Sequence, residues 1–251
     1  MIRVGTAGWS IPRAAASEFP GVGSHLERYA RILSCAEINS SFYRPHAVKV
    51  YERWAASTPP SFRFSVKLPR AITHEGELRR PGPLLDAFFE QTAGLGEKLG
   101  ALLVQLPPSQ AFNSRVAGPF FTKLRERYAG TVVCEPRHIT WFEANANDML
   151  VRHRVARVAT DPSRIKAALS PGGWMPPATP GAAVYYRLHG SPRKYWSRYP
   201  QERLRQWASE IQALPPDTEA WCIFDNTASG AAMENALEVR ALLSPQRSAL
   251  A

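Results

Sequence analysis

Cysteine is scarce in this sequence, and long apolar runs are absent. Only Cys35, Cys134 and Cys222 occur in 251 residues, each in a short apolar stretch and without the spacing of a metal site. This excludes a small disulfide-stapled scaffold and indicates buried thiols in a reducing compartment. No apolar run approaches the roughly 18 residues of a membrane span, so we expect no membrane segment.

Familiar catalytic motifs are missing as well. There is no Walker loop, no serine nucleophile elbow and no His-x-His or His-Glu-x-x-His pair. The first five residues, MIRVG, are typical of a strand and lack the charged and then apolar start of a signal peptide. We therefore expect a cytoplasmic protein.

Acidic residues are outnumbered by basic ones. Lys and Arg total 31 against 21 Asp and Glu, a net charge of +10. Such an excess suits a polyanion or a phosphorylated substrate. However, Arg outnumbers Lys by 25 to 6 and no run of five basic residues occurs, so genome composition explains the bias equally well.

Short apolar stretches alternate with segments of helical period. Strands are expected over 2–6, 35–39, 62–67, 101–105, 131–135, 155–161, 183–189 and 221–225. Helices are expected over 24–33, with a Ser24–Glu27 capping box, and over 48–57, 84–99, 116–128, 147–153, 201–214 and 231–243. Eight βα units in about 250 residues predict an α/β fold, a closed (β/α)8 TIM-type barrel, with a doubly wound open sheet as the alternative.

The sixth unit departs from this pattern. Residues 162–181 include Pro171-Gly172-Gly173 and Pro176-Pro177, which leave room for a short helix near 164–169 at most. We expect the rest to be a long loop within one barrel domain spanning 1–251. Its core covers about 2–243, and the tail from 244 is expected to fray.

Charged residues near the strand ends indicate which side chains face the barrel interior. Side chains alternate along a strand, and a charge pressed against the outer helices would lose its hydration without a partner. By this argument polar groups gather at the carboxyl ends of the strands: Glu37, Asn39, Lys67, Gln105, Glu135, Asp161, Arg187, His189 and Asp225. Barrel enzymes carry their chemistry at this end. A structural network of ion pairs is the alternative.

Seven ordered motifs lie at or beside these residues. They are VGTAGW at 4–9, EINSSFY at 37–43, FSVK at 64–67 with PR at 69–70 and ITH at 72–74, QLPP at 105–108, EPRH at 135–138 with WF at 141–142, YRLHG at 186–190 and NA at 235–236. Over residues 4 to about 243 the chain resembles the domain-of-unknown-function 72 family, also called YecE-like. The resemblance implies a TIM-type barrel and no settled biochemical activity.

Acids and bases together suit a site that binds an anion and transfers a proton. We expect Glu37, Glu135, His189 and Asp225 to be catalytic. The residues expected to bind substrate are Asn39, Tyr43, Lys67, Arg70, His74, Gln105, Arg137, His138, Trp141, Arg187, Tyr195 and Asn226. Phosphate, sulfate or a carboxylate is expected beside Arg187 and Lys67, where we expect few acidic neighbours. Loops 190–194 and 226–230 either present backbone N–H groups to phosphate or are simply solvated.

No motif implies a cofactor. His74, His138 and His189 lie at strand ends and raise the question of a divalent metal, which nearby Arg and Lys would repel. Three functions stay open. We favour an enzyme, such as a hydrolase or lyase, that acts on a phosphorylated or otherwise anionic small substrate. A nucleic-acid-binding or phosphodiester-cleaving barrel and a non-catalytic binding barrel are the alternatives.

Overall fold

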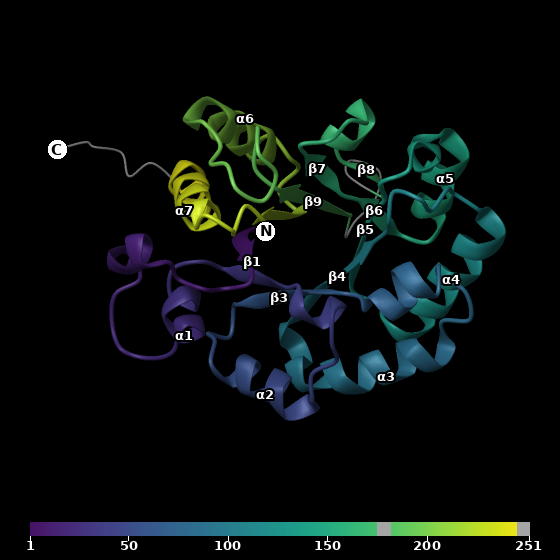
Figure 1. The fold of residues 1–251 in the computed structure, drawn as a ribbon, viewed down its shortest axis with the longest axis horizontal. Helices are drawn as coiled ribbons and strands as arrows, with labels where there is room; N and C mark the ends of the chain where they lie inside the picture. Colours follow the sequence, from purple (N-terminus) through teal and green to yellow (C-terminus); the bar gives the residue numbers. More distant parts are fainter. Residues whose placement is uncertain (175–181, 245–251) are drawn as a thin grey trace.

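Strands and helices alternate along the computed structural model, which describes residues 1–174 and 182–244 (Figure 1). The strands are β1 Ile2–Ala7, β2 Cys35–Ile38, β3 Arg63–Lys67, β4 Leu99–Gln105, β5 Thr131–Glu135, β6 Val155–Arg157, β7 Ala159–Asp161, β8 Gly172–Gly173, β9 Ala183–Leu188 and β10 Glu219–Phe224. The α-helices are α1 His25–Ala30, α2 Val48–Ala56, α3 Gly82–Thr92, α4 Ser114–Arg127, α5 Ala144–Arg152, α6 Gln201–Gln212 and α7 Ala231–Leu243. Short 3-10 helices cover Arg13–Glu18, Ser40–Phe42, Ala93–Lys98, Ile139–Phe142 and Lys166–Leu169, and a π-helix covers Ala71–Glu75.

The strands form one sheet in the order β7-β9-β10-β1-β2-β3-β4-β5-β6-β8. Every pairing is parallel except that of β6 with the two-residue β8. β6 and β7 are halves of one predicted strand, interrupted at Val158, and they pair with β5 and β9 respectively. The sheet therefore bends into a nearly closed barrel with the α-helices outside it (Figure 1). The α/β barrel class is confirmed, and the open doubly wound sheet is wrong.

The sixth unit is irregular, as predicted. Between β7 and β9 the described residues hold the short helix Lys166–Leu169 and β8, and no α-helix. The loop prediction missed β8, where a side chain at Gly172 would collide with Arg157. Pro176-Pro177 lies outside the described residues. The predicted helix over 84–99 is also wrong beyond Thr92, because Gly96 has a left-handed φ of 52° that breaks α-helical geometry.

Strand side chains divide into two apolar layers. Ala36, Ile38, Phe64 and Val66 belong to the large core between the sheet and the helices. A smaller cluster, which includes Cys35, Leu103, Val133, Tyr185 and Ile223, fills the lumen. The predicted alternation is confirmed, because Glu37 lies between two outward residues and Arg187 shares its face with Tyr185. No helix in the described part of the chain has the length and apolar character to cross a bilayer.

Candidate functional site

Arg187, at the end of β9, lies at the centre of the barrel mouth with a side chain 1% exposed. Its Nε and Nη2 donate to the two carboxylate oxygens of Glu37 at 2.9 and 2.7 Å. Nη1 donates to Glu135, and Nη2 also donates to Asp225 at 3.0 Å. Strands β2 and β5 and the end of β10 thus aim three carboxylates at one guanidinium. The expectation that Arg187 has few acidic neighbours is wrong, and each of its three guanidinium nitrogens donates to a carboxylate of the protein.

Further contacts complete this buried network. Tyr185 Oη lies 3.0 Å from Glu37 Oε2 and 2.9 Å from Ser65 Oγ. Arg137 donates through Nε and Nη2 to Glu135 Oε1 at 3.1 and 2.9 Å. Burial alone would raise the pKa of Glu135, but the Arg187 and Arg137 guanidiniums more than reverse this and hold it well below its usual range. The pKa of Asp225 is likewise lowered, because Arg187 and His189 outweigh burial.

His189 follows β9 and is fully buried. Its Nδ1 lies 3.0 Å from Asp225 Oδ2, and its Nε2 lies 3.4 Å from Glu135 Oε1 without hydrogen-bond geometry. Among the described residues, Nε2 has no hydrogen-bond partner. A carboxylate thus lies near each ring nitrogen, Asp225 at Nδ1 and Glu135 at Nε2. Tyr195 is 42% exposed, and its ring packs edge-on against the imidazole at 5.2 Å, on the side of His189 toward solvent.

Lys67, at the end of β3, is a buried cation in the same site. Its Nζ lies 3.9 Å from the centre of the Phe42 ring, and its amine makes no hydrogen bond or ion pair with any described residue. Burial, helped by Arg187, lowers the pKa of Lys67 to about 8, although Glu135, Glu37 and Asp225 oppose the shift. Its charge is therefore available to a ligand near neutral pH.

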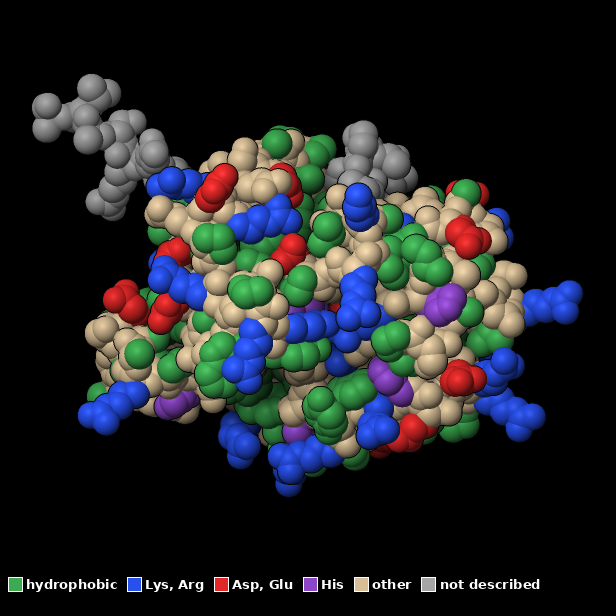
Figure 2. Space-filling model, turned by 45° about the horizontal axis from the view of Figure 1, so that its top comes forward, with side chains coloured by type: hydrophobic (Ala, Val, Ile, Leu, Met, Phe, Trp, Pro, Cys, Tyr) green, Lys and Arg blue, Asp and Glu red, His purple; other side chains and the backbone are tan. Residues whose placement is uncertain are grey.

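Lys194, on the loop after β9, brings a further cation to the mouth. Its Nζ lies 5.1 Å from the centre of the Tyr195 ring. Burial and the neighbouring Arg137 lower the pKa of Lys194. On one face of the molecule, Lys and Arg side chains gather near the middle with His side chains beside them (Figure 2). The mouth of the barrel thus holds three carboxylates and four cations, which are Arg187, Arg137, Lys67 and Lys194.

Three predicted ligand residues instead hold the fold together. Trp141 is 1% exposed and donates from Nε1 to the Gln110 carbonyl at 3.0 Å. Asn226 is fully buried and donates to the Ser197 carbonyl and to Asn235. His138 Nδ1 accepts from the Thr140 N–H and caps the 3-10 helix that follows. These three side chains thus have structural contacts, and their assignment to substrate stays a prediction.

Other predicted residues lie around the mouth without joining the buried network. Arg70 is half-exposed and pairs with Glu75 at 2.9 Å. His74 contacts Thr73 Oγ1 at 2.9 Å and packs edge-on against Phe42, while Tyr43 is 71% exposed. The Gln105 amide donates to the Leu106 carbonyl. Asn39, after β2, makes no side-chain hydrogen bond in the described structure, and its Oδ1 is buried.

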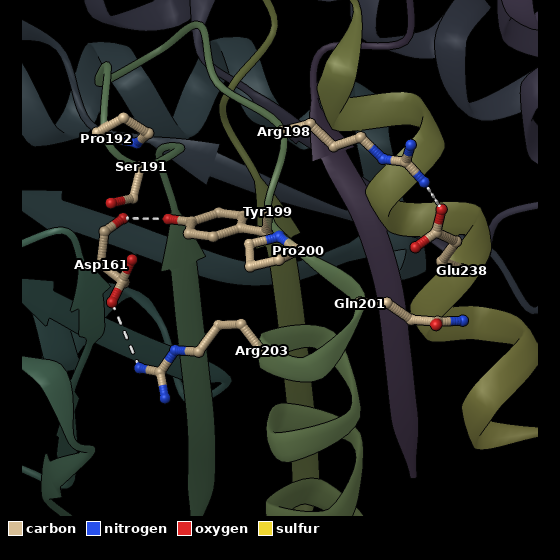
Figure 3. A pocket seen from close by; sticks show the side chains of 9 residues that line it. All are labelled: Asp161, Ser191, Pro192, Arg198, Tyr199, Pro200, Gln201, Arg203 and Glu238. Carbon is tan, nitrogen blue, oxygen red and sulfur yellow. Dashed lines mark hydrogen bonds and ion pairs between the residues drawn. The ribbon is translucent and has the colours of Figure 1, made fainter.

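Asp161, expected among the inward acids, lies elsewhere. It has the same orientation on β7 as the outer-core residue Ala159, and it pairs with Arg203 at 3.4 Å. It lines an open hollow of about 880 Å³ beside the start of α6, where Tyr199 Oη donates to its backbone carbonyl and Arg198 pairs with Glu238 (Figure 3). The charges of this hollow are thus largely paired with one another.

The loops expected to cradle phosphate use only some of their N–H groups internally. The N–H groups of Ala228 and Gly230 donate to backbone carbonyls, that of Gly190 donates to Tyr199 Oη and that of Arg193 donates to Ser197 Oγ. Both alternatives for these loops stay predictions. In the part of the chain that the structure describes, no group of three or more His, Cys, Asp or Glu side chains could hold a metal ion.

Sequence reasoning missed Tyr185 in the network and Trp54 beside it. Phe42 and Lys194 lie in segments that the sequence singled out, the motif at 37–43 and the loop at 190–194, but neither was assigned to substrate. Tyr185 lies two residues before Arg187 on the same strand, so alternation alone places it in the lumen. Phe42 and Trp54 carry no such signal, because their positions depend on how the loop after β2 and helix α2 pack. Lys194 belongs to a basic loop, but its approach to the buried network depends on the path of that loop.

Known proteins resemble this chain along its whole length. The model of the family described as "Protein of unknown function DUF72" matches residues 3–251. UPF0759 protein YunF of Bacillus subtilis is 24% identical over an alignment covering 100% of this chain and 98% of the relative. UPF0759 protein YecE of Escherichia coli K12 is 35% identical over 107 residues, which cover 43% of this chain but only 38% of that protein's length.

Solved structures agree with the fold. A DUF72 family protein of Thermotoga maritima has a TM-score of 0.77 and 26% identity, with 97% of this chain and 99% of that one covered. A DUF72 family protein of Enterococcus faecalis has a TM-score of 0.77 and 22% identity, with 97% and 95% covered. With the family match spanning nearly all residues, this chain belongs to the DUF72 family of proteins of unknown function.

Proposed function

We propose that this protein is an enzyme that binds a phosphorylated or carboxylated small molecule at the carboxyl ends of the strands and transfers a proton through His189. One observation carries the proposal. The buried network satisfies Glu37, Glu135, Asp225 and Arg187, yet among the described residues the Lys67 amine has no hydrogen bond or ion pair and His189 Nε2 has no hydrogen bond. Lys67 lies over the Phe42 ring, and Nε2 lies 3.4 Å from Glu135 Oε1. A purely structural network gains little from a cation and a buried imidazole nitrogen that make no hydrogen bond.

Each residue then has a defined role. Lys67, the outer edge of Arg137 and Lys194 bind the anionic group of the substrate. His189 accepts a proton at Nε2 from a carbon or hydroxyl near that group, and Asp225 stabilises the imidazolium that forms. Arg187 touches no substrate and positions the three carboxylates. Proton transfer of this kind contributes roughly 10²–10⁴-fold to a rate. A hydrolase or a lyase fits these roles.

Titration calorimetry with inorganic phosphate, followed by turnover assays over phosphorylated and carboxylated metabolites, tests the proposal. Wild-type protein is expected to bind phosphate, and Lys67→Met is expected to weaken binding by about tenfold or more, the scale of a charge-assisted hydrogen bond. His189→Asn is expected to retain binding and lose turnover. If wild type neither binds phosphate nor turns over any of these compounds, the proposal is wrong.

A second function, binding of single-stranded nucleic acid, is favoured by three exposed aromatic side chains near the mouth. Tyr43, Tyr195 and Trp196 are 71%, 42% and 46% exposed. Arg193 lies 4.6 Å from the centre of the Trp196 ring. Aromatic rings beside cations can stack on bases. A steep fall of oligonucleotide affinity with salt, together with a loss of affinity in Trp196→Ala, would support this function, whereas a shallow slope would favour the small substrate.

A further inference from the structure

A cavity of about 750 Å³ lies at the carboxyl ends of β1, β2 and β10, on one side of the buried network. The loops after these three strands and the start of α7 form its walls. Glu37 lies at its inner edge, so the cavity adjoins the carboxylate cluster around Arg187. This volume exceeds what a phosphate group fills and lies within the range of small-molecule sites.

The cavity differs in charge from the rest of the mouth. No Lys, Arg or His is among the described residues that line it. The three cations assigned to anion binding, Lys67, Arg137 and Lys194, come from the ends of β3, β5 and β9 instead. A ligand that spans both parts therefore meets positive charge at one end and, at the other, a wall without cations in which the Glu37 carboxylate is paired with Arg187.

The wall carries groups that recognise hydroxyls and an apolar ring face. Trp9 and Trp54 are half-buried, and their rings contact each other edge-on at 5.0 Å. The Asn39 side chain has no hydrogen bond in the described structure, and its Oδ1 is buried. Leaving such an acceptor unsatisfied costs free energy unless a ligand or water completes it. Ser10 and Thr227 add hydroxyl groups nearby.

We propose that this cavity binds the uncharged, hydroxyl-bearing ring of a sugar phosphate whose phosphate lies at Lys67, Arg137 and Lys194. Asn39 would donate to and accept from ring hydroxyls, and Trp9 would pack against the apolar face of the sugar. This inference rests on the proposed function, because it assumes that the anion binds at the cations. It adds a substrate class, and it gives Asn39 and Trp9 a role in specificity.

Calorimetric titrations with inorganic phosphate, ribose 5-phosphate and glucose 6-phosphate test the inference. At least one sugar phosphate is expected to bind about tenfold or more tightly than phosphate. Asn39→Leu is expected to remove most of this advantage while the phosphate affinity stays the same. Trp9→Ala should act in the same direction, and Val151→Ala, at an exposed position on α5 outside the cavity, should leave the advantage intact. Thermal unfolding of each variant checks that it folds.

The outcomes separate the two proposals. If phosphate does not bind to wild type, the proposed function fails at its anion site. If phosphate binds but neither sugar phosphate gains affinity over it, the assignment of this cavity to a sugar ring is wrong. That assignment is also wrong if the gain in affinity persists in folded Asn39→Leu and Trp9→Ala proteins.

Discussion

At the scale of single residues, the mouth of the barrel contains two kinds of polar side chain. Glu37, Glu135, Asp225 and Arg187 are satisfied by one another, so they explain the stability of a charged lumen. The Lys67 amine and His189 Nε2 stand outside these interactions. Strand alternation in the sequence correctly placed these side chains inside the barrel. It could not show which of them would find hydrogen-bond and ion-pair partners, because that depends on distances across the barrel.

Arg187→Met tests the network directly. Removing the guanidinium leaves three buried carboxylates without their shared partner, and breaking a buried ion pair typically costs about 3–5 kcal/mol. We expect the free energy of unfolding, measured in urea, to fall by about this amount, or the variant not to fold at all. Arg70→Met is the matched control, since its half-exposed pair with Glu75 is worth about 1 kcal/mol or less. Equal, small losses in both variants would contradict the network.

The proposed anion site should depend on pH through Lys67. Its pKa of about 8 means that the amine loses its positive charge as the pH rises through that value. The affinity for sulfate, which does not titrate in this range, should therefore fall between about pH 7 and 9. Lys67→Arg stays charged and should shift this loss to higher pH. A sulfate affinity that is flat across the range in wild type would remove Lys67 from the site.

At the scale of elements, strand alternation and capping were predictable, and departures from regularity were not. The Ser24–Glu27 capping box is confirmed: the Glu27 carboxylate accepts from the Ser24 N–H at 2.6 Å, and the Ser24 hydroxyl accepts from the Glu27 N–H at 3.3 Å. The break at Val158 and the short strand β8 depend on pairing with residues distant in sequence. No local pattern in the sequence encodes such pairing.

Alanine substitutions at two glycines compare the cost of a side chain between closely packed strands with the effect of helix propensity. A Cβ at Gly5 would lie 2.0 Å from the Cys35 carbonyl oxygen, which is backbone of the paired strand β2. Gly5→Ala should therefore destabilise the protein by about 3 kcal/mol or more, at the upper end of overpacking costs. In α4, a Cβ at Gly118 meets nothing within 4 Å beyond its chain neighbours and its own helix backbone, but Pro119 follows and disfavours helical geometry for a preceding residue with a Cβ, so Gly118→Ala should gain less than the usual about 0.5–1 kcal/mol. Urea unfolding measures both, and a tolerated Gly5→Ala would count against the β1–β2 register.

At the scale of the whole molecule, the barrel closes around charges that fix its response to acid. The folded state lowers the pKa of Glu135 and of Asp225. The two ionised carboxylates therefore stabilise the fold fully at a pH above their ordinary pKa values. This stabilisation is lost as the pH falls from there through the lowered pKa values of the folded state. We expect the free energy of unfolding to decline below about pH 5, and Glu135→Gln to be less stable at neutral pH with a shallower decline. An identical pH dependence in wild type and variant would contradict this account.

The barrel was predictable from the sequence because its βα alternation extends along most of the chain. The site was predictable only in part. Strand ends place Glu37, Glu135, Arg187 and Lys67 together, whereas the loop residues Trp141, His138 and Asn226 have structural roles that their types do not reveal. The cavity beside Trp9 and Asn39 forms from three separate loops, so no single segment encodes it.

The central claim is that an anion binds beside Lys67 and within reach of the free nitrogen of His189. Nitrogen-15 NMR of the histidine side chains during a phosphate titration tests it most directly. We predict that the His189 Nε2 resonance moves as phosphate binds in wild type and stays fixed in Lys67→Met. A His189 Nε2 resonance that phosphate leaves unchanged in wild type would contradict the account.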